Sequence, residues 1–134
     1  ILSSLIEKEL QKISKSKIQL LSIKVNKKSP LNSVELSSDL NKIKDKSLVL
    51  IDDVLNSGKT LIHCVKYLLD VPLANFNTVV LIDRNHKKYP IKIDFKGLSL
   101  STSIKENVSV VFILGSPFFT PFVFFSDLFF FLWC

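Results

Sequence analysis

The residues best suited to bind a ligand lie in Val49–Thr60, where two acids, two hydroxyl side chains and a glycine follow a short apolar run. Leu48–Ile51 is apolar and β-rich, which is typical of a strand buried in a parallel sheet. Such a strand brings Asp52 and Asp53 to the carboxyl edge of the sheet, where open α/β folds bind their ligands. Paired carboxylates at this edge could bind vicinal hydroxyl groups or the ligand shell of Mg²⁺.

The turn that follows the two acids has the composition of a phosphate-binding site. Ser57, Gly58 and Thr60 open a segment of helical periodicity, so main-chain N–H groups and hydroxyls converge at a helix N-terminus. Gly58 allows the backbone to approach a ligand closely. Since Asp52 and Asp53 would repel a phosphate, they should bind another part of the same ligand, and a sugar phosphate satisfies both halves of the site. An acidic strand end followed by a capped helix is the alternative without a ligand.

Other ligand-binding and catalytic patterns are excluded or weak. Gly58-Lys59-Thr60 also occurs in the nucleotide-binding P-loop, but a P-loop requires glycine five positions before Gly58, where this chain has Asp53. The sequence offers no Ser/His/Asp or Cys/His set for nucleophilic catalysis. Cys64 and Cys134 have neither metal-ligand spacing nor a disulfide framework, which fits a cytoplasmic protein.

The pattern of apolar residues predicts an α/β fold with a mainly parallel central sheet flanked by helices. Helical spacing is found in residues 1–13 and between Gly58 and Pro72, where the predicted buried face is Leu61, Ile62, Val65, Leu68 and Leu69. Strand patterns are found in residues 17–25, 48–51, 78–82, 91–95 and 108–112. Residues 26–46 and 96–107 are predicted to be loops.

The chain of 134 residues has the length of one domain and a formal net charge of +6. Arg84 is its one arginine, and lysines between residues 8 and 105 supply the remaining positive charge. Since nucleic-acid surfaces favour arginine and interleaved aromatic residues, we interpret the lysines first as solvated surface. The positive field would also attract a phosphorylated ligand. The absence of methionine predicts that an N-terminal portion of the natural protein is missing.

Residues 113–134 depart from the α/β pattern. Eight of the 11 phenylalanines lie between Phe118 and Phe131, Asp127 is the one charge, and no polar/apolar alternation is present. We therefore divide the chain into a domain of residues 1–112 and an apolar tail of residues 113–134. Non-native or frame-shifted sequence is the preferred interpretation of the tail, with a native buried segment and a membrane anchor as alternatives. Two prolines and Asp127 argue against the anchor.

These features resemble a known family. Val49–Thr60 resembles the phosphoribosyl pyrophosphate (PRPP) signature of type I phosphoribosyltransferases, which has four apolar residues, two acids and a Thr/Ser-Gly-x-Thr turn. Three later segments resemble the bifunctional pyrimidine operon attenuator/uracil phosphoribosyltransferases, namely Leu81–Ile91, Asp94–Gly97 and Ser101–Ser103. The resemblance covers residues 1–112. The family usually has glycine at the position of Asn85 and arginine at the positions of Lys59 and Lys87.

The resemblance implies an enzyme that transfers ribose 5-phosphate from PRPP to a nucleobase, uracil or a related base, and releases pyrophosphate. The implied PRPP site comprises Asp52, Asp53, Val54, Leu55, Asn56, Ser57, Gly58, Lys59 and Thr60. In this site Asp52 and Asp53 are the catalytic residues that hold the ribose hydroxyls, while Asn56–Thr60 hold the 5′-phosphate. Mg²⁺ would be bound together with PRPP. Arg84 and His86 would lie on the side of the base and pyrophosphate.

The resemblance also implies partners and dynamics. The polar segment of residues 26–39 corresponds to a loop that closes over the reacting centre and excludes water. A homo-oligomer in the cytoplasm, without a membrane partner, is expected. Two alternatives to the enzyme stay open. One is an RNA-binding regulator of pyrimidine genes that senses nucleotides, and the other is a truncated fragment without activity.

Overall fold

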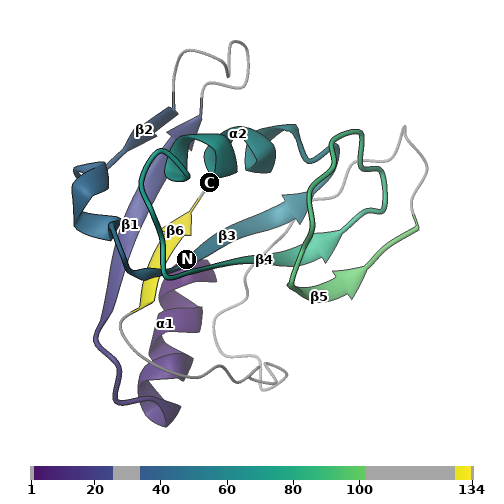
Figure 1. Cartoon of the computed structure of the whole chain (residues 1–134). Coiled ribbons are helices and arrows are strands. Elements are labelled where there is room, and N and C mark those ends of the chain that lie inside the picture. The colour runs from purple at the N-terminus through teal and green to yellow at the C-terminus, as the bar shows by residue number, and fades with distance from the viewer. Residues whose placement is uncertain (1, 26–33, 102–128, 134) are drawn as a thin grey trace.

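The computed structural model describes residues 2–25 and 34–101 and, for residues 129–133, the backbone. The elements follow one another as α1 (Leu2–Ile13), β1 (Ile18–Val25), β2 (Val34–Leu36), the 3₁₀ helix η1 (Leu40–Ile43), β3 (Ser47–Leu55), α2 (Lys59–Leu68), β4 (Asn75–Asp83), β5 (Phe95–Ser99) and β6 (Phe129–Trp133) (Figure 1). No helix within these described ranges is long and apolar enough to cross a membrane.

The strands form one sheet in the order β2-β1-β6-β3-β4-β5 (Figure 1). Neighbouring strands from β1 to β5 pair in parallel, and β2 pairs antiparallel with β1 at one edge. β3 and β4 pair from Ser47 opposite Asn75 to Leu55 opposite Asp83, and α2 is the crossover that a parallel pair requires. The predicted fold class, a mainly parallel sheet flanked by helices, is confirmed.

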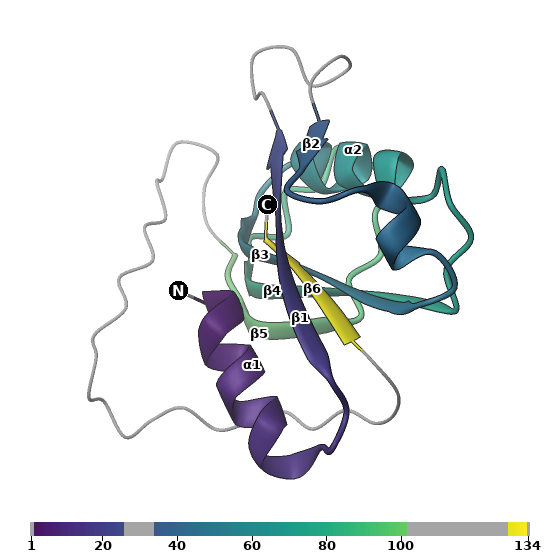
Figure 2. The ribbon, with the colours of Figure 1, turned by 90° about the vertical axis from the view of Figure 1, so that its left-hand side faces the viewer.

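β3 is buried on both faces because a helix covers each side of the sheet, as Figures 1 and 2 show for α1 and α2. Leu48 and Leu50 belong to a core cluster with the α2 residues Leu61, Cys64 and Leu68. Val49 and Ile51 belong to a second cluster with Leu2 and Leu10 of α1. This division follows from the alternation of side chains along a strand. It explains why residues 48–51 are continuously apolar rather than alternating.

Several predicted boundaries in the middle of the chain need correction. β3 does not end at Ile51 but continues to Leu55, so both acids lie inside the strand. The helix ends at Leu68, and Leu69, which was predicted to be buried, is 57% exposed because it lies beyond the last helical turn. Residues 34–46 are not a continuous loop, since they contain β2 and η1. Ile43 of η1 is fully buried, and Val34, Leu36 and Leu40 pack against the same core cluster. β2 and η1 are too short to give a clear periodic signal.

The strand predicted for residues 91–95 is wrong, since β5 begins at Phe95 and runs to Ser99, into the predicted loop of residues 96–107. Ile91 and Ile93 pack against the core cluster on the α2 side without joining the sheet. Their apolar spacing therefore imitates a strand. β5 itself is the edge strand and its residues after Phe95 are exposed, so its sequence lacks a buried face.

The strand predicted for residues 108–112 lies outside the described residues. Of the tail of residues 113–134, the structure describes Phe129–Trp133, which forms β6. β6 pairs in parallel with β1 from Ile18 to Ser22 and with β3 from Ser47 to Ile51. Residues 113–134 were predicted to depart from the α/β pattern, whereas the backbone of these five residues forms a strand inside the sheet. The division of the chain at residue 112 stays a prediction.

Candidate functional site

Asp52 and Asp53 occupy the carboxyl-terminal part of β3, and both are partly buried. Asp52 Oδ1 accepts the Asp53 N–H at 2.9 Å, and Asp53 Oδ1 accepts the Val54 N–H at 2.7 Å. Both side chains therefore bend toward the carboxyl edge of the sheet. Leu50 packs toward α2 and Ile51 toward α1, but Leu55 belongs to the same cluster as Leu50, so strict alternation does not continue through the two acids. The two carboxylates lie next to each other at the end of the strand.

The turn between β3 and α2 presents the start of a helix to the same edge. Gly58 has φ of 81° and ψ of 0°, the left-handed region that glycine adopts readily. Lys59 donates its N–H to Ser57 Oγ at 3.3 Å, and Ile62 donates its N–H to the Gly58 carbonyl at 3.0 Å. α2 starts at Lys59, and a helix N-terminus carries partial positive charge from N–H groups without intrahelical partners. The geometry is suited to a phosphate group.

The segment after β4 lies beside this turn. Leu55 at the end of β3 is opposite Asp83 at the end of β4, and Asp83 is opposite Ser99 of β5. Arg84 donates its main-chain N–H to the Leu55 carbonyl at 3.1 Å, and its side chain is buried. His86, two residues further on, is partly buried. The structure thus brings Arg84 and the segment Asp52–Thr60 to one edge of the sheet.

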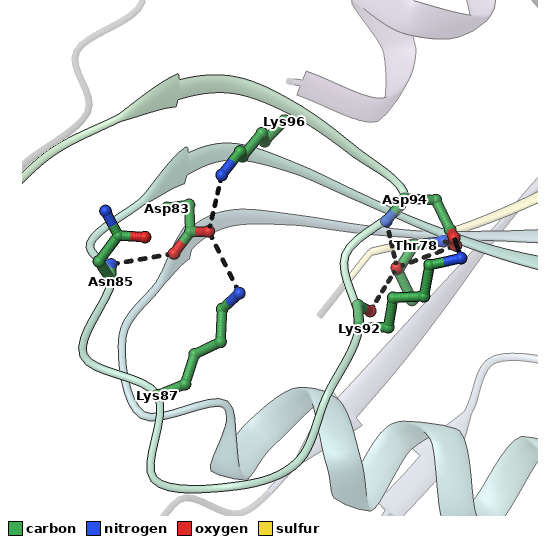
Figure 3. Close-up of polar contacts among 7 residues, drawn as sticks. All are labelled: Thr78, Asp83, Asn85, Lys87, Lys92, Asp94 and Lys96. Carbon is green, nitrogen blue, oxygen red and sulfur yellow. Dashed lines mark hydrogen bonds and ion pairs between the residues drawn. The ribbon is translucent and has the colours of Figure 1, made fainter.

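Asp83, a buried carboxylate at this edge, was not among the predicted site residues. The Asp83 side chain is 1% exposed, and it accepts the Asn85 N–H at 3.0 Å (Figure 3). Lys87 Nζ at 3.3 Å and Lys96 Nζ at 3.4 Å both contact its Oδ2. Burial alone would raise the pKa of Asp83, but the Asn85 hydrogen bond and the two ammonium groups outweigh burial and lower the pKa. The sequence does contain a signal for this ion pair, because Asp83 ends an apolar strand and Lys87 follows four residues later.

A second carboxylate, Asp94, fixes the other end of the same segment. It accepts the Thr78 N–H at 2.9 Å and pairs with Lys92 Nζ at 3.0 Å (Figure 3). Burial opposes its ionisation, yet the bonds from Thr78 and Lys92 lower the pKa of Asp94. The segment of residues 84–93 is therefore anchored at both ends, by Asp83 at the end of β4 and by Asp94 just before β5. Within the part of the chain that the structure describes, no three His, Cys, Asp or Glu side chains form a metal-binding group.

Comparison with known sequences assigns the family. The phosphoribosyl transferase domain matches residues 6–112. A bifunctional protein PyrR of Ligilactobacillus salivarius is 38% identical over 81 residues, which are 60% of this chain and 44% of the relative. A bifunctional protein PyrR of Bacillus pumilus is 35% identical over 92 residues, or 67% of this chain and 49% of the relative. The chain spans about half the length of the curated relatives it matches.

Comparison with solved structures supports the same fold. The hypoxanthine phosphoribosyltransferase of Trypanosoma cruzi superposes with a TM-score of 0.61 at 16% identity, over 75% of this chain and 52% of that chain. A hypoxanthine phosphoribosyltransferase of Staphylococcus aureus gives a TM-score of 0.54 at 17% identity, over 76% and 70% of the two chains. At such low identity the likeness shows the fold alone. Because the domain match spans most of the sequence, the chain belongs to the phosphoribosyl transferase domain family.

Proposed function

We propose that this chain carries the site that binds the ribose 5-phosphate part of PRPP, in a protein that transfers this group to a nucleobase and releases pyrophosphate. One observation carries the proposal. The carboxylates of Asp52 and Asp53 and the glycine turn at the start of α2 share the carboxyl edge of β3, inside a phosphoribosyl transferase domain.

The two halves of this site suit the two ends of a ribose 5-phosphate. The turn Asn56–Thr60 offers main-chain N–H groups and hydroxyls to the 5′-phosphate, with the helix dipole of α2 behind them. Asp52 and Asp53 accept hydrogen bonds from the 2′- and 3′-hydroxyls. Because both carboxylates lie near the carboxyl end of β3, beside the turn that leads into α2, we propose that the ribose lies across the end of the strand. The hydrogen bonds that both acids now make to the main chain would be exchanged for bonds to the ribose.

The proposed reaction needs positioning and charge stabilisation more than a protein nucleophile. The C1′–O bond breaks with both electrons leaving on pyrophosphate, a base nitrogen forms the C1′–N bond, and the proton of that nitrogen leaves to water. Positive charge develops on the ribose ring as the first bond breaks. Asp52 and Asp53, held next to the ring, would stabilise this charge and fix the orientation of the sugar.

Mg²⁺ is the cofactor that we propose for the reaction, bound together with PRPP. The donors fit this role, since Mg²⁺ commonly binds through one or two carboxylates together with phosphate oxygens of the substrate. Asp52 and Asp53 supply such carboxylates at the proposed site. When bound, the ion would neutralise charge on the departing pyrophosphate. The described residues supply no larger acidic group, so we propose that the substrate itself completes the coordination.

The proposal also covers the nucleobase, the cellular location and the oligomeric state. Arg84 and His86 are assigned to the side of the base and pyrophosphate because their segment lies next to the phosphate turn. Uracil is the first base to test, as expected for pyrimidine salvage. A cytoplasmic homo-oligomer is the proposed form. The resemblance of Leu81–Ile91 to the bifunctional pyrimidine operon attenuator/uracil phosphoribosyltransferases supports the choice of a pyrimidine. This chain covers only about half of the relatives it matches.

A thermal-shift titration of the full chain with PRPP and Mg²⁺ tests this function. Ligand at 100 times its Kd adds about 2.7 kcal/mol to the free energy of unfolding, so the melting temperature should rise with concentration. The double variant Asp52→Asn/Asp53→Asn should lose most of this rise. Glu35→Gln/Asp70→Asn removes two exposed charges elsewhere and should retain it. A folded wild-type chain whose melting temperature does not respond would contradict the proposal.

RNA binding is the second proposed function, supported by the formal net charge of +6 and by the exposed lysines Lys87 and Lys88 beside the site. The single arginine argues against base-specific contacts. Binding that depends on nucleotide and weakens steeply between low and moderate salt would support a regulatory role. Weak binding that is indifferent to nucleotides would indicate only the attraction of a basic protein to RNA.

A further inference from the structure

The segment after β4 holds the phosphate turn through its main chain. Lys88 and Tyr89 both donate their N–H groups to the Ser57 carbonyl, at 2.9 and 3.1 Å. A third hydrogen bond, from the Arg84 N–H to the Leu55 carbonyl, joins the same two segments where they leave β4 and β3. A carbonyl with two main-chain donors has a fixed direction. We call the segment Arg84–Ile91 the clamp.

The direction of the Ser57 carbonyl decides what the phosphate turn presents to a ligand. In a planar trans peptide, the carbonyl of one residue and the N–H of the next point in opposite directions. The two donors on the Ser57 carbonyl therefore orient the Gly58 N–H away from the clamp. Glycine adopts positive and negative φ about equally well, so Gly58 itself does not prevent this peptide from turning over. A turned peptide would present a carbonyl oxygen, which repels phosphate.

Side-chain packing reinforces the arrangement. A Cβ atom built on Gly58 would lie 2.8 Å from Ile91 Cγ2 and 3.7 Å from the Tyr89 carbonyl oxygen. Ile91 therefore rests directly on the Gly58 backbone. Asp83 anchors the start of the clamp through the Asn85 N–H and the ammonium groups of Lys87 and Lys96 (Figure 3).

We propose that Ile91 and Asp83 are positioning residues, which act through the clamp to hold the Ser57–Gly58 peptide in its phosphate-binding orientation. The inference rests on the proposed function, because it assigns a phosphate to this turn. Neither side chain has to touch the ligand. If the competent orientation of the peptide becomes a minor population, the apparent affinity for phosphate falls by the same fraction.

Four variants separate this role from general stability. Ile91→Ala removes the methyl group that rests on Gly58, while Ile91→Val keeps that methyl and loses only the terminal carbon. Asp83→Asn removes the charge that binds both lysines. Asp94→Asn removes a comparable carboxylate at the far end of the segment, where Thr78 is about 16 Å from Asp83 along the strand.

Calorimetric titration of the full chain with inorganic phosphate and with ribose 5-phosphate gives the test. Ile91→Ala and Asp83→Asn should weaken both ligands by the same factor, about tenfold if the competent population falls to a tenth. Ile91→Val and Asp94→Asn should bind like wild type, even where their melting temperatures fall. Asp52→Asn/Asp53→Asn should weaken ribose 5-phosphate without weakening inorganic phosphate, because the two carboxylates repel a bound phosphate. Wild-type affinity in Ile91→Ala would overturn the inference.

A wild-type chain that binds neither ligand would count against the proposed function. In that case an NMR measurement still tests the role of the clamp. The Gly58 amide should give one sharp resonance in the wild type and in Ile91→Val. In Ile91→Ala it should shift, broaden or double, because the Ser57–Gly58 peptide samples both orientations. An unchanged Gly58 resonance in Ile91→Ala and Asp83→Asn would overturn the clamp, whatever the ligand measurements show.

Discussion

Replacement of Gly58 by alanine should destabilise the folded chain through two separate effects. The residue has φ of 81°, and an L-residue in the left-handed region costs about 1–2 kcal/mol. The new Cβ would also lie 2.8 Å from Ile91 Cγ2, closer than carbon atoms pack. Overpacking of this kind costs about 1–3 kcal/mol. Together these effects predict a loss of roughly 2–5 kcal/mol in the free energy of unfolding.

Urea denaturation of the full chain can separate the two effects through a double-mutant cycle. Ile91→Ala removes the colliding methyl group, so Gly58→Ala should cost less in that background than in the wild type. The backbone cost should remain in both backgrounds. A Gly58→Ala chain within about 0.5 kcal/mol of wild type would refute the reasoning on the turn. Strict additivity of the two substitutions would refute the contact between Gly58 and Ile91.

Three further predictions concern the framework that supports the site. Leu50→Ala should cost about 2–5 kcal/mol in urea denaturation, because Leu50 is fully buried in the core under α2, and a loss below 1 kcal/mol would contradict that packing. Gly97→Ala should destabilise the pairing of β4 with β5, since a Cβ would lie 2.8 Å from the Leu81 carbonyl oxygen, and Ile91→Ala should not relieve this effect. Asp83 and Asp94 have pKa values below the ordinary 3.8, so their stabilisation should be complete above about pH 4 and lost as the pH falls through the folded-state values. Denaturation at a series of pH values should show a smaller acid-induced loss in Asp83→Asn, and an equal loss would contradict the role of this carboxylate.

The sequence predicted the centre of the fold well because its signals there are local. Four consecutive apolar residues followed by two acids, Ser57, Gly58 and a helical pattern specify the β3–α2 unit without knowledge of distant residues. The family resemblance of the same segment is confirmed by the domain match over residues 6–112. The assignment of the site residues to ligand groups remains a prediction.

The errors arose where tertiary contacts decide the structure. Ile91 and Ile93 have strand-like spacing but pack on the core from a loop, and the exposed edge strand β5 lacks a periodic signal. β2 is only three residues long. The position of β6 between β1 and β3 depends on pairing between residues more than 70 positions apart, which no local pattern reports. The burial of Asp83 depends likewise on Lys96 from the neighbouring strand.

The most direct test of the central claim is to locate the PRPP site by NMR. In the full chain titrated with PRPP and Mg²⁺, we predict the largest amide shifts in residues 52–60, with smaller shifts in the neighbouring clamp. In Asp52→Asn/Asp53→Asn the same titration should give much smaller shifts. Saturable shifts confined to other parts of a folded chain, or none at all, would contradict the assignment of Asp52–Thr60 as the ribose-phosphate site.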